Sequence, residues 1–119
     1  MCGVSGIFGQ KANKANIIKM SEIINHRGPD NQDFTIHNEI AISSNRLSII
    51  DLKSSANQPM ISEDGKFYLA FNGELWKPSF KKHWDRLFKK YNFKTKRSDS
   101  ELLLYYLIDN LDNLQSALN

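Results

Sequence analysis

The sequence predicts an α+β domain in which short strands come first and helices follow. Residues 2–8, CGVSGIF, mix small and apolar residues in the manner of a buried strand. After Leu75 the apolar residues recur with the period of a helix. Strands followed by helices are typical of layered α+β domains, and 119 residues suit one such domain.

The first half of the chain should hold one helix among its strands. Residues 14–25 place Ile17, Met20 and Ile24 on one helical face. The other elements expected there are a breaker-rich turn at 26–31, strands at 33–37 and 40–44 around Asn38-Glu39, and another extended stretch at 46–52.

The second half should open with a hairpin and continue as helices. Residues 62–65 predict a turn between residues 58–61 and a strand at 66–72. Pro78 suits the first turn of a helix, and Ser98 with Glu101 fits the capping box of a second one. The first of these helices carries an apolar stripe made of Phe80, Trp84, Leu87, Phe88 and Tyr91, and a last helical stretch is expected at 110–119.

The composition limits the classes of protein to which the chain can belong. Hydrophobic residues make up 40% and charged residues 24%, a globular balance that excludes wholesale disorder. The longest strongly apolar run, at 102–108, is far shorter than the ~20 residues that span a bilayer, so we expect no membrane partner. A single cysteine excludes an intrachain disulfide, and the three histidines lack metal-ligand spacing, so we expect no metal. Without a signal peptide, a cytoplasmic location is expected.

Cys2 has two interpretations. A single cysteine is usually a small buried hydrophobe. Removal of Met1 would instead make Cys2 the N-terminus, with a thiol and an α-amine on one residue. The α-amine, with a pKa of about 7.7–8.0, can then act as the base for the thiol, directly or through water.

Six sequence blocks, in order along nearly the whole chain, favour the second interpretation. They resemble the glutaminase domain of the class II, N-terminal-nucleophile glutamine amidotransferases. Within that family the chain is most similar to the asparagine synthase (glutamine-hydrolysing) branch, to which HRGPD and RLSIIDL point. The blocks are MCGVSGIFG at 1–9, HRGPD at 26–30, SSNRLSIIDL at 43–52, QPM at 58–60, FNGEL at 71–75 and SDSELLL at 98–104.

The resemblance implies a reaction and a role for each site residue. Cys2 would attack the side-chain carboxamide of glutamine, form a thioester and release ammonia, and water would then release glutamate. The Asn72 side-chain amide and the Gly73 backbone N–H would stabilise the oxyanion. His26 and Arg27 keep only a role in organising their turn. The implied substrate-binding residues are Arg46 for the α-carboxylate, with Glu74 and Asp99 for the α-ammonium group.

The resemblance also implies a fold and partners. The fold would be the αββα sandwich of Ntn hydrolases, two antiparallel sheets between helices, cut short at its C-terminal end. Residues 2–119 would then form an incomplete glutaminase domain without its synthetase domain. This chain would need no cofactor, because ATP and Mg²⁺ would belong to the missing synthetase domain. The expected partners are glutamine and a synthetase domain or other acceptor enzyme that amidates aspartate or a sugar, and a homodimer stays open.

Two alternatives from other classes remain. The chain can be a truncated, inactive remnant or an interaction fragment, since catalysis requires the thiol and the oxyanion donors to be held within a fraction of an ångström. Residues 81–97 hold eight Lys and Arg against one Asp, which favours contact with nucleic acid. Most of these cations fall opposite the apolar stripe, as on any solvated helix face, so we expect no nucleic-acid partner.

Overall fold

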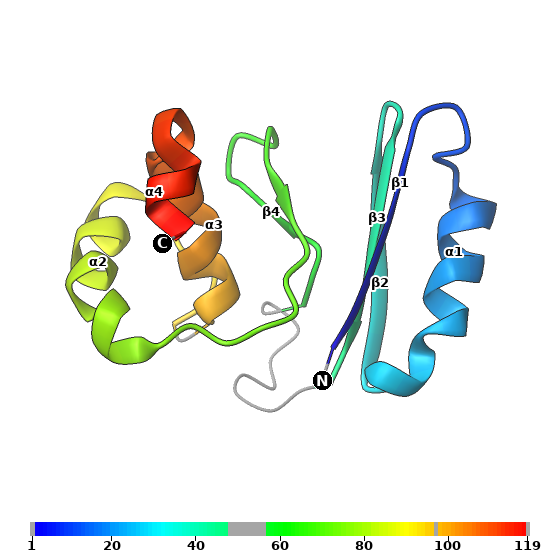
Figure 1. Ribbon diagram of the computed structural model, residues 1–119, viewed down its shortest axis with the longest axis horizontal. Helices are drawn as coiled ribbons and strands as arrows, with labels where there is room; N and C mark the ends of the chain where they lie inside the picture. The colour runs from blue at the N-terminus through cyan, green and yellow to red at the C-terminus, as the bar shows by residue number, and fades with distance from the viewer. Residues whose placement is uncertain (1, 48–56, 97, 119) are drawn as a thin grey trace.

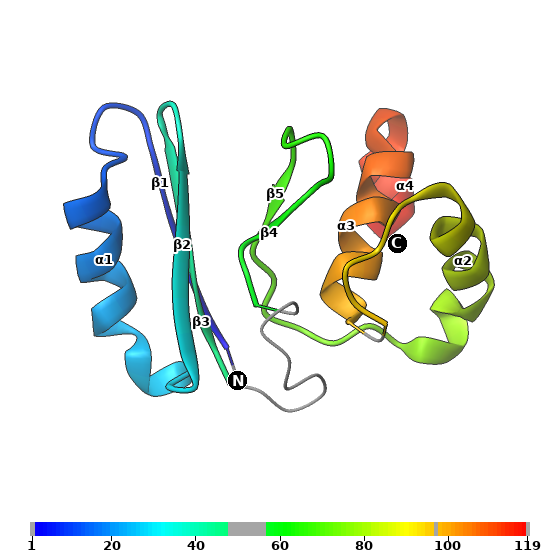
Figure 2. The same ribbon diagram turned by 180° about the vertical axis from the view of Figure 1, so that it is seen from behind.

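The chain forms two halves, each an antiparallel sheet with helices on its outer side (Figure 1). The computed structural model describes residues 2–47, 57–96 and 98–118. From one side to the other, the layers are one helix, a three-stranded sheet, a two-stranded sheet and the remaining helices (Figure 2). The predicted combination of helices with antiparallel strands is therefore confirmed. No helix in the described part of the chain is long and apolar enough to cross a membrane.

The three-stranded sheet contains β1 (Gly3–Phe8), β2 (Asn31–His37) and β3 (Ile40–Arg46), with β3 in the centre. The chain reverses between β2 and β3 at Asn38, which takes a positive φ of 51°, a conformation that Asn tolerates well. The strands expected at 2–8, 33–37 and 40–44 are confirmed, and β3 extends two residues further. Most of the stretch expected at 46–52 lies outside the described residues.

Helix α1 (Lys14–Ile23) covers the outer face of this sheet through a polar contact as well as an apolar one. Ile17 is fully buried, whereas Met20, placed on the same helical face by the sequence, is 37% exposed. Ser21 is buried instead, and its hydroxyl donates a 2.7 Å hydrogen bond to Oδ1 of Asn45 on β3. The helix therefore turns a serine, and not the next large apolar side chain, toward a polar position of the central strand.

The two-stranded sheet pairs β4 (Met60–Ile61) with β5 (Tyr68–Leu69) across the predicted hairpin turn. Its second strand is shorter than the predicted 66–72. The backbone N–H of Phe71 donates to Oε1 of Gln58, 2.5 Å away, so this part of the chain is anchored by a side chain and not by a strand ladder.

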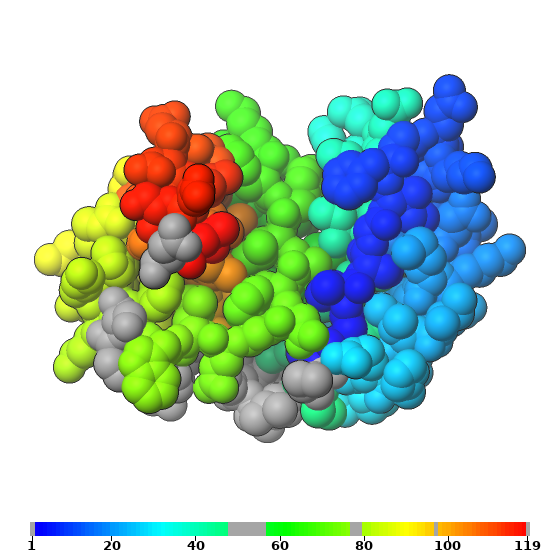
Figure 3. Space-filling view, viewed as in Figure 1, coloured from blue at the N-terminus to red at the C-terminus, as the bar shows by residue number. Residues whose placement is uncertain are grey.

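The inner faces of the two sheets meet at one end through an aromatic pair. The ring of His37 on β2 stacks on the ring of Tyr68 on β5, with centroids 5.5 Å apart. At the other end, the dark blue start of the chain lies next to the green segment of the second half (Figure 3). The two halves therefore face each other as layers.

Three helices form the outer layer of the second half. They are α2 (Lys77–Lys90), α3 (Asp99–Asp109) and the short α4 (Leu114–Leu118), which follows a 3₁₀ turn at Leu111–Asn113. Leu104 of α3 packs on Met60 of β4 and so joins the helices to the sheet. The predicted apolar stripe of α2 packs against α3, with Phe88 at its edge, 37% exposed; the buried centre of the cluster is Leu87, Leu102 and Tyr105.

The predicted capping box at the start of α3 does not form. The Ser98 side chain makes no capping hydrogen bond. Glu101, which is buried, turns back to the preceding loop and accepts from the backbone N–H groups of Lys94 and Thr95, at 2.8 and 2.7 Å. The carboxylate therefore holds the loop from α2 to α3 and not the N-cap residue.

The turn after α1 is pressed against the end of β3. It contains a 3₁₀ turn, η1 (Asn25–Arg27), followed by Gly28. A Cβ added to Gly28 would lie 2.2 Å from the carbonyl oxygen of Asn45, so only glycine allows this approach. The backbone N–H of Asp30 then donates to the carbonyl oxygen of Arg46, at 3.0 Å.

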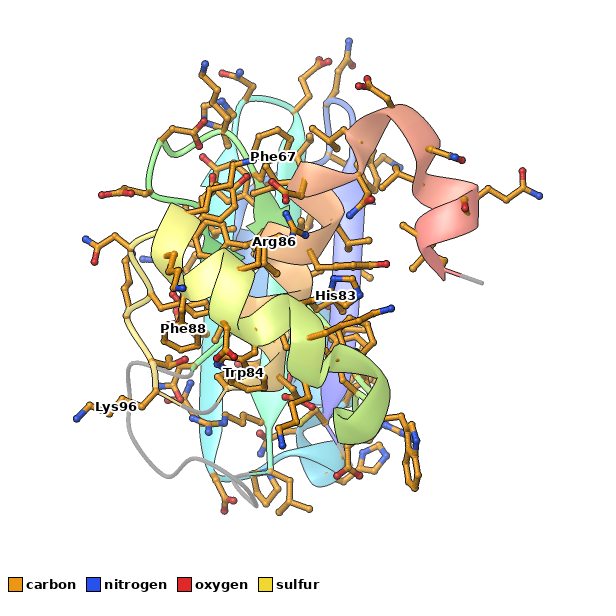
Figure 4. All side chains as sticks on the ribbon, turned by 90° about the vertical axis from the view of Figure 1, so that its left-hand side faces the viewer. Phe67, His83, Trp84, Arg86, Phe88 and Lys96 are labelled. Carbon is orange, nitrogen blue, oxygen red and sulfur yellow. The ribbon has the colours of Figure 1, made fainter. Side chains whose placement is uncertain are left out.

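Asp109, at the end of α3, contacts three side chains, two from α2 and one from the C-cap residue of that helix. Its carboxylate, only 5% exposed, accepts from Arg86, from Nζ of Lys90 at 2.5 Å and from the hydroxyl of Tyr91 at 2.7 Å. Figure 4 labels Arg86 among the side chains of the helical half. Burial alone would raise the pKa of this carboxyl. The hydrogen bonds from Lys90, Tyr91 and Arg86 outweigh that effect and lower the pKa from 3.8 to about 2. Arg86 and Lys90, two of the cations predicted for the solvated face of α2, are thus partly neutralised by Asp109.

We expect the Asp109 cluster to stabilise the fold at neutral pH and to lose its effect in acid. Because the folded pKa lies below that of an unfolded Asp, about 3.9, the contribution is complete above about pH 5 and fades as pH falls toward 2. Asp109→Asn should lower the free energy of unfolding at pH 7 by about 1 kcal/mol, since the half-exposed cations are screened by water. Urea unfolding at pH 7 and pH 3 measures this, with the exposed Asp112→Asn as control; equal losses for the two variants would contradict it.

Gly28→Ala should destabilise the protein strongly, because the new methyl group meets backbone atoms that cannot rotate away. We expect a loss of about 1–3 kcal/mol or more in the free energy of unfolding. Gly6→Ala is the matched control in the same sheet half, since its Cβ would find only an ordinary 3.7 Å contact. Thermal melting of both variants compares them, and similar melting temperatures would show that the turn at Gly28 is not tightly packed.

Candidate functional site

The pairing of β1 with β3 places Cys2 beside Arg46. Gly3 is paired with Asn45, so the residue before Gly3 falls next to the end of β3. The Sγ atom of Cys2 lies 3.9 Å from the carbonyl oxygen of Leu47, within reach of a weak S–H···O contact. Side chains alternate along a strand, and Asn45 points to α1, so Arg46 points to the opposite face, toward the two-stranded sheet.

Arg27 also holds the N-terminal segment. Its Nε donates a 3.4 Å hydrogen bond to the carbonyl oxygen of Cys2. The sequence assigned Arg27 only to organising its turn, and no local pattern indicated this contact across 25 residues. The hydrogen bond joins the HRGPD block to the start of the chain, and neither segment by itself indicates a contact with the other.

Arg46 is almost completely buried, at 8% exposure. Its Nη1 donates to Oδ1 of Asn57, 2.7 Å away. Asn57 lies at the entry to β4, so the hydrogen bond connects the three-stranded sheet with the second half. Such a contact fixes the plane of the guanidinium group, which is the part that recognises a carboxylate.

The expected oxyanion residues lie shortly after β5, beyond Ala70 and Phe71. Asn72 and Gly73 are exposed, and so is Glu74 after them. A Cβ on Gly73 would lie 2.6 and 2.8 Å from atoms of the Phe71 ring. A larger residue at position 73 would therefore require the Phe71 ring to move, so glycine allows the close packing within this turn.

Asp99 joins this turn to the start of α3. Its Oδ2 accepts from the backbone N–H of Leu75, at 3.2 Å. Glu74 immediately precedes Leu75, so the two carboxylates expected to bind an ammonium group lie in adjoining segments. Asp99 is also the first residue of α3, where a negative charge is favourable to the helix dipole.

The six predicted residues lie in two groups. Cys2 and Arg46 belong to the end of the three-stranded sheet, and the other four belong to the turn after β5 and the start of α3. Within the part of the chain that the structure describes, hydrogen bonds of Asn57 and its neighbour Gln58 connect the two groups. Gln58 accepts from Phe71 N–H, and its Nε2 donates to Oγ of Ser100, at 2.8 Å.

Two buried polar atoms lie on the same inner face and were not singled out in the sequence. Asn31 is directly opposite Arg46 on β2, and Ser44 is two residues before it on β3. Nδ2 of Asn31 and Oγ of Ser44 have no hydrogen-bond partner among the described residues. A buried polar atom without a partner costs roughly 1–3 kcal/mol, and no motif or spacing signals such a position.

The described residues contain no group of three or more His, Cys, Asp or Glu that could hold a metal ion. A cavity of about 160 Å³ opens beside Asn57, between β4 and α3, with Met60 and Leu104 in its wall. Glu101 also lines it, but both carboxylate oxygens are already occupied by backbone N–H groups.

The chain is similar to known proteins over most of its length. The family model of the glutamine amidotransferase domain matches residues 1–118. The chain is 36% identical over 109 residues to a probable asparagine synthetase (glutamine-hydrolysing) of Schizosaccharomyces pombe, covering 88% of this chain and 19% of that protein. It is 33% identical over 125 residues to a putative asparagine synthetase of Methanocaldococcus jannaschii, covering 87% and 23% of the two chains.

A further relative is an asparagine synthetase (glutamine-hydrolysing) of Bacillus subtilis, 36% identical over 110 residues, or 87% of this chain and 17% of that protein. The chain thus spans about a fifth of the length of the curated relatives that it matches. The match to the family model covers almost the entire chain, as the six sequence blocks predict. The chain therefore belongs to the glutamine amidotransferase domain family.

Proposed function

We propose that the chain hydrolyses glutamine to glutamate and ammonia, with Cys2 as the nucleophile. The observation that carries this proposal is the position of Cys2 at the head of β1, beside the buried Arg46. A thiol next to a fixed guanidinium group suits a substrate that has a carboxylate at one end and a reactive carbonyl carbon further along. Family membership supports the same reading.

The charges around the site suit a free amino acid. Arg46 offers a cation from the sheet side, and Glu74 and Asp99 offer carboxylates from the other side. An amino acid carries an α-carboxylate and an α-ammonium group, which these two sides would bind. A peptide amide lacks both charges, so the arrangement favours glutamine over glutamine residues in proteins.

The proposed first half-reaction begins once Met1 has been removed. The Cys2 thiol passes its proton to its own α-amine, directly or through water, and the sulfur attacks the carboxamide carbon. The tetrahedral oxyanion accepts hydrogen bonds from the Asn72 amide and the Gly73 N–H. The carbon–nitrogen bond then breaks, and the nitrogen takes the proton from the α-ammonium group and leaves as ammonia.

The second half-reaction returns the enzyme to its starting state. Water attacks the thioester and gives its proton to the α-amine, and the same donors hold the second oxyanion. Collapse of this intermediate expels the thiolate, which recovers its proton, and glutamate is released. The fold that we propose for this chemistry is the Ntn-hydrolase sandwich, whose four layers the present helix, sheet, sheet and helix arrangement supports.

The ammonia is proposed to serve an asparagine-synthase-type amidation, because the relatives named above are asparagine synthetases. In this proposal the acceptor is bound by a synthetase domain or a separate enzyme, which would also bind ATP and Mg²⁺. The glutaminase chain itself supplies no group for that step.

Replacing Cys2 should abolish glutamine hydrolysis. Cys2→Ala removes the nucleophile, and Cys2→Ser should lower turnover by orders of magnitude, because an alcohol is far less ionised than a thiol at neutral pH. Glutamate release measures turnover, and intact mass should show that Met1 is absent from active protein. Wild-type turnover in Cys2→Ala, or Met1 retained in an active sample, would falsify the proposed chemistry.

Arg46 and Asn72 should affect different kinetic constants. Arg46→Lys keeps the charge but loses the paired N–H groups, so KM for glutamine should rise about 10- to 100-fold with a smaller change in kcat. Asn72→Ala removes a donor that acts in the transition state and should lower kcat about 10²- to 10³-fold. Steady-state kinetics on both variants distinguish these roles, and equal effects on both constants would count against them.

A further inference from the structure

Gln58 uses both ends of its side-chain amide to connect two segments that carry site residues. It is 7% exposed and precedes β4. Its Oε1 accepts from the backbone N–H of Phe71 at 2.5 Å, and its Nε2 donates to the Ser100 hydroxyl at 2.8 Å. A backbone N–H can only donate, so the Phe71 contact fixes which end of the amide is oxygen.

The Phe71 contact matters because the strand ladder has already ended. The described pairing of β5 stops at Leu69, two residues earlier. Beyond that point the backbone enters the turn with Asn72 and Gly73, and Gln58 supplies the acceptor that a neighbouring strand would otherwise give. The position of the candidate oxyanion donors therefore depends on one side chain.

The Ser100 contact ties the same side chain to α3. Ser100 is buried in the first turn of that helix, next to Asp99. Asp99 in turn accepts from the N–H of Leu75, at 3.2 Å. The turn at 72–74 is thus held on both sides, before it through Gln58 and after it through Asp99, and both anchors lead to the start of one helix.

The neighbouring residue extends the connection to the other half. Asn57 accepts a hydrogen bond from Arg46. Because Asn57 immediately precedes Gln58, the position of Arg46 is linked to that of Gln58 through one peptide bond. We propose that Gln58 is a positioning residue, which holds the oxyanion turn in a fixed place relative to Asp99 and Arg46. This inference rests on the proposed function for its catalytic consequence, but the placement of the turn can be tested separately.

Two substitutions at Gln58 should affect turnover differently. Gln58→Leu fills a similar volume and leaves Phe71 N–H and the Ser100 hydroxyl without their partner. Misplacement of about 1 Å at a reacting centre can cost 10²-fold in rate, so we expect kcat to fall about 10- to 100-fold, with a smaller change in KM. Gln58→Glu keeps an acceptor for Phe71 and accepts from the Ser100 hydroxyl, so turnover should recover to within about 10-fold of wild type.

Gln32→Leu is the matched control. Nε2 of Gln32 donates to Ser21, at 2.8 Å, on the outer face of the three-stranded sheet, away from Cys2. The control loses one side-chain hydrogen bond of a glutamine, so we expect it to lower the melting temperature without changing kcat. Alkylation of Cys2 by iodoacetamide should proceed at the wild-type rate in both leucine variants, because it needs no oxyanion turn.

The experiment measures kinetics, melting and amide hydrogen exchange in the natural full-length protein. Exchange at the Phe71 amide, from which Gln58 accepts a hydrogen bond, should be at least about 10-fold faster in Gln58→Leu than in wild type or Gln32→Leu. Unchanged exchange at this amide overturns the inference whether or not the protein hydrolyses glutamine. Faster exchange with kcat equal to that of Gln32→Leu, or Gln58→Glu as slow as Gln58→Leu, overturns the role in positioning. An inactive wild type with the expected exchange pattern contradicts the proposed function alone.

Discussion

The antiparallel pairing of β1 with β3 fixes the place of Cys2 beside Arg46. Side chains alternate along a strand, so a slip of one residue would turn Arg46 toward α1 and bring Asn45 to the inner face. The observed pairing is held by contacts that the alternative would lose: the buried Asn45 bonds to Ser21, and Gly28 fits against the carbonyl oxygen of Asn45. Contacts on the α1 side of the three-stranded sheet therefore determine which side chains point to its other face, toward the two-stranded sheet.

The second half is held together by side-chain hydrogen bonds to backbone more than by strand pairing. Strands β4 and β5 are only two residues long. Glu101 holds the loop before α3, Asp99 holds Leu75, and Gln58 holds Phe71. Each of these side chains satisfies N–H groups of irregular backbone, which would otherwise be left without a partner in a partly buried position. The start of α3 thereby becomes the support for the loops that carry Asn72 to Glu74.

The distribution of charge follows from this construction. The three-stranded sheet contributes the guanidinium group of Arg46, with Arg27 bonded to the Cys2 carbonyl, whereas the helical half contributes Glu74 and Asp99. The candidate cation and the candidate carboxylates thus belong to different halves of the molecule. In the proposed function these charges would bind the α-carboxylate and the α-ammonium group of a free amino acid.

The sequence by itself determined the elements, their order and the family, because these depend on local periodicity, on turn residues such as Asn38 and on blocks of adjacent residues. It also named the candidate site residues, through the resemblance of those blocks. Only the tertiary structure decided which partner each polar side chain takes. Glu101 fits a capping box locally but bonds to Lys94 and Thr95, and Ser21 of α1 is buried whereas Met20 is 37% exposed. Arg27 reaches Cys2 and Gln58 reaches Ser100 because the fold brings distant segments within hydrogen-bonding distance, which no local pattern encodes.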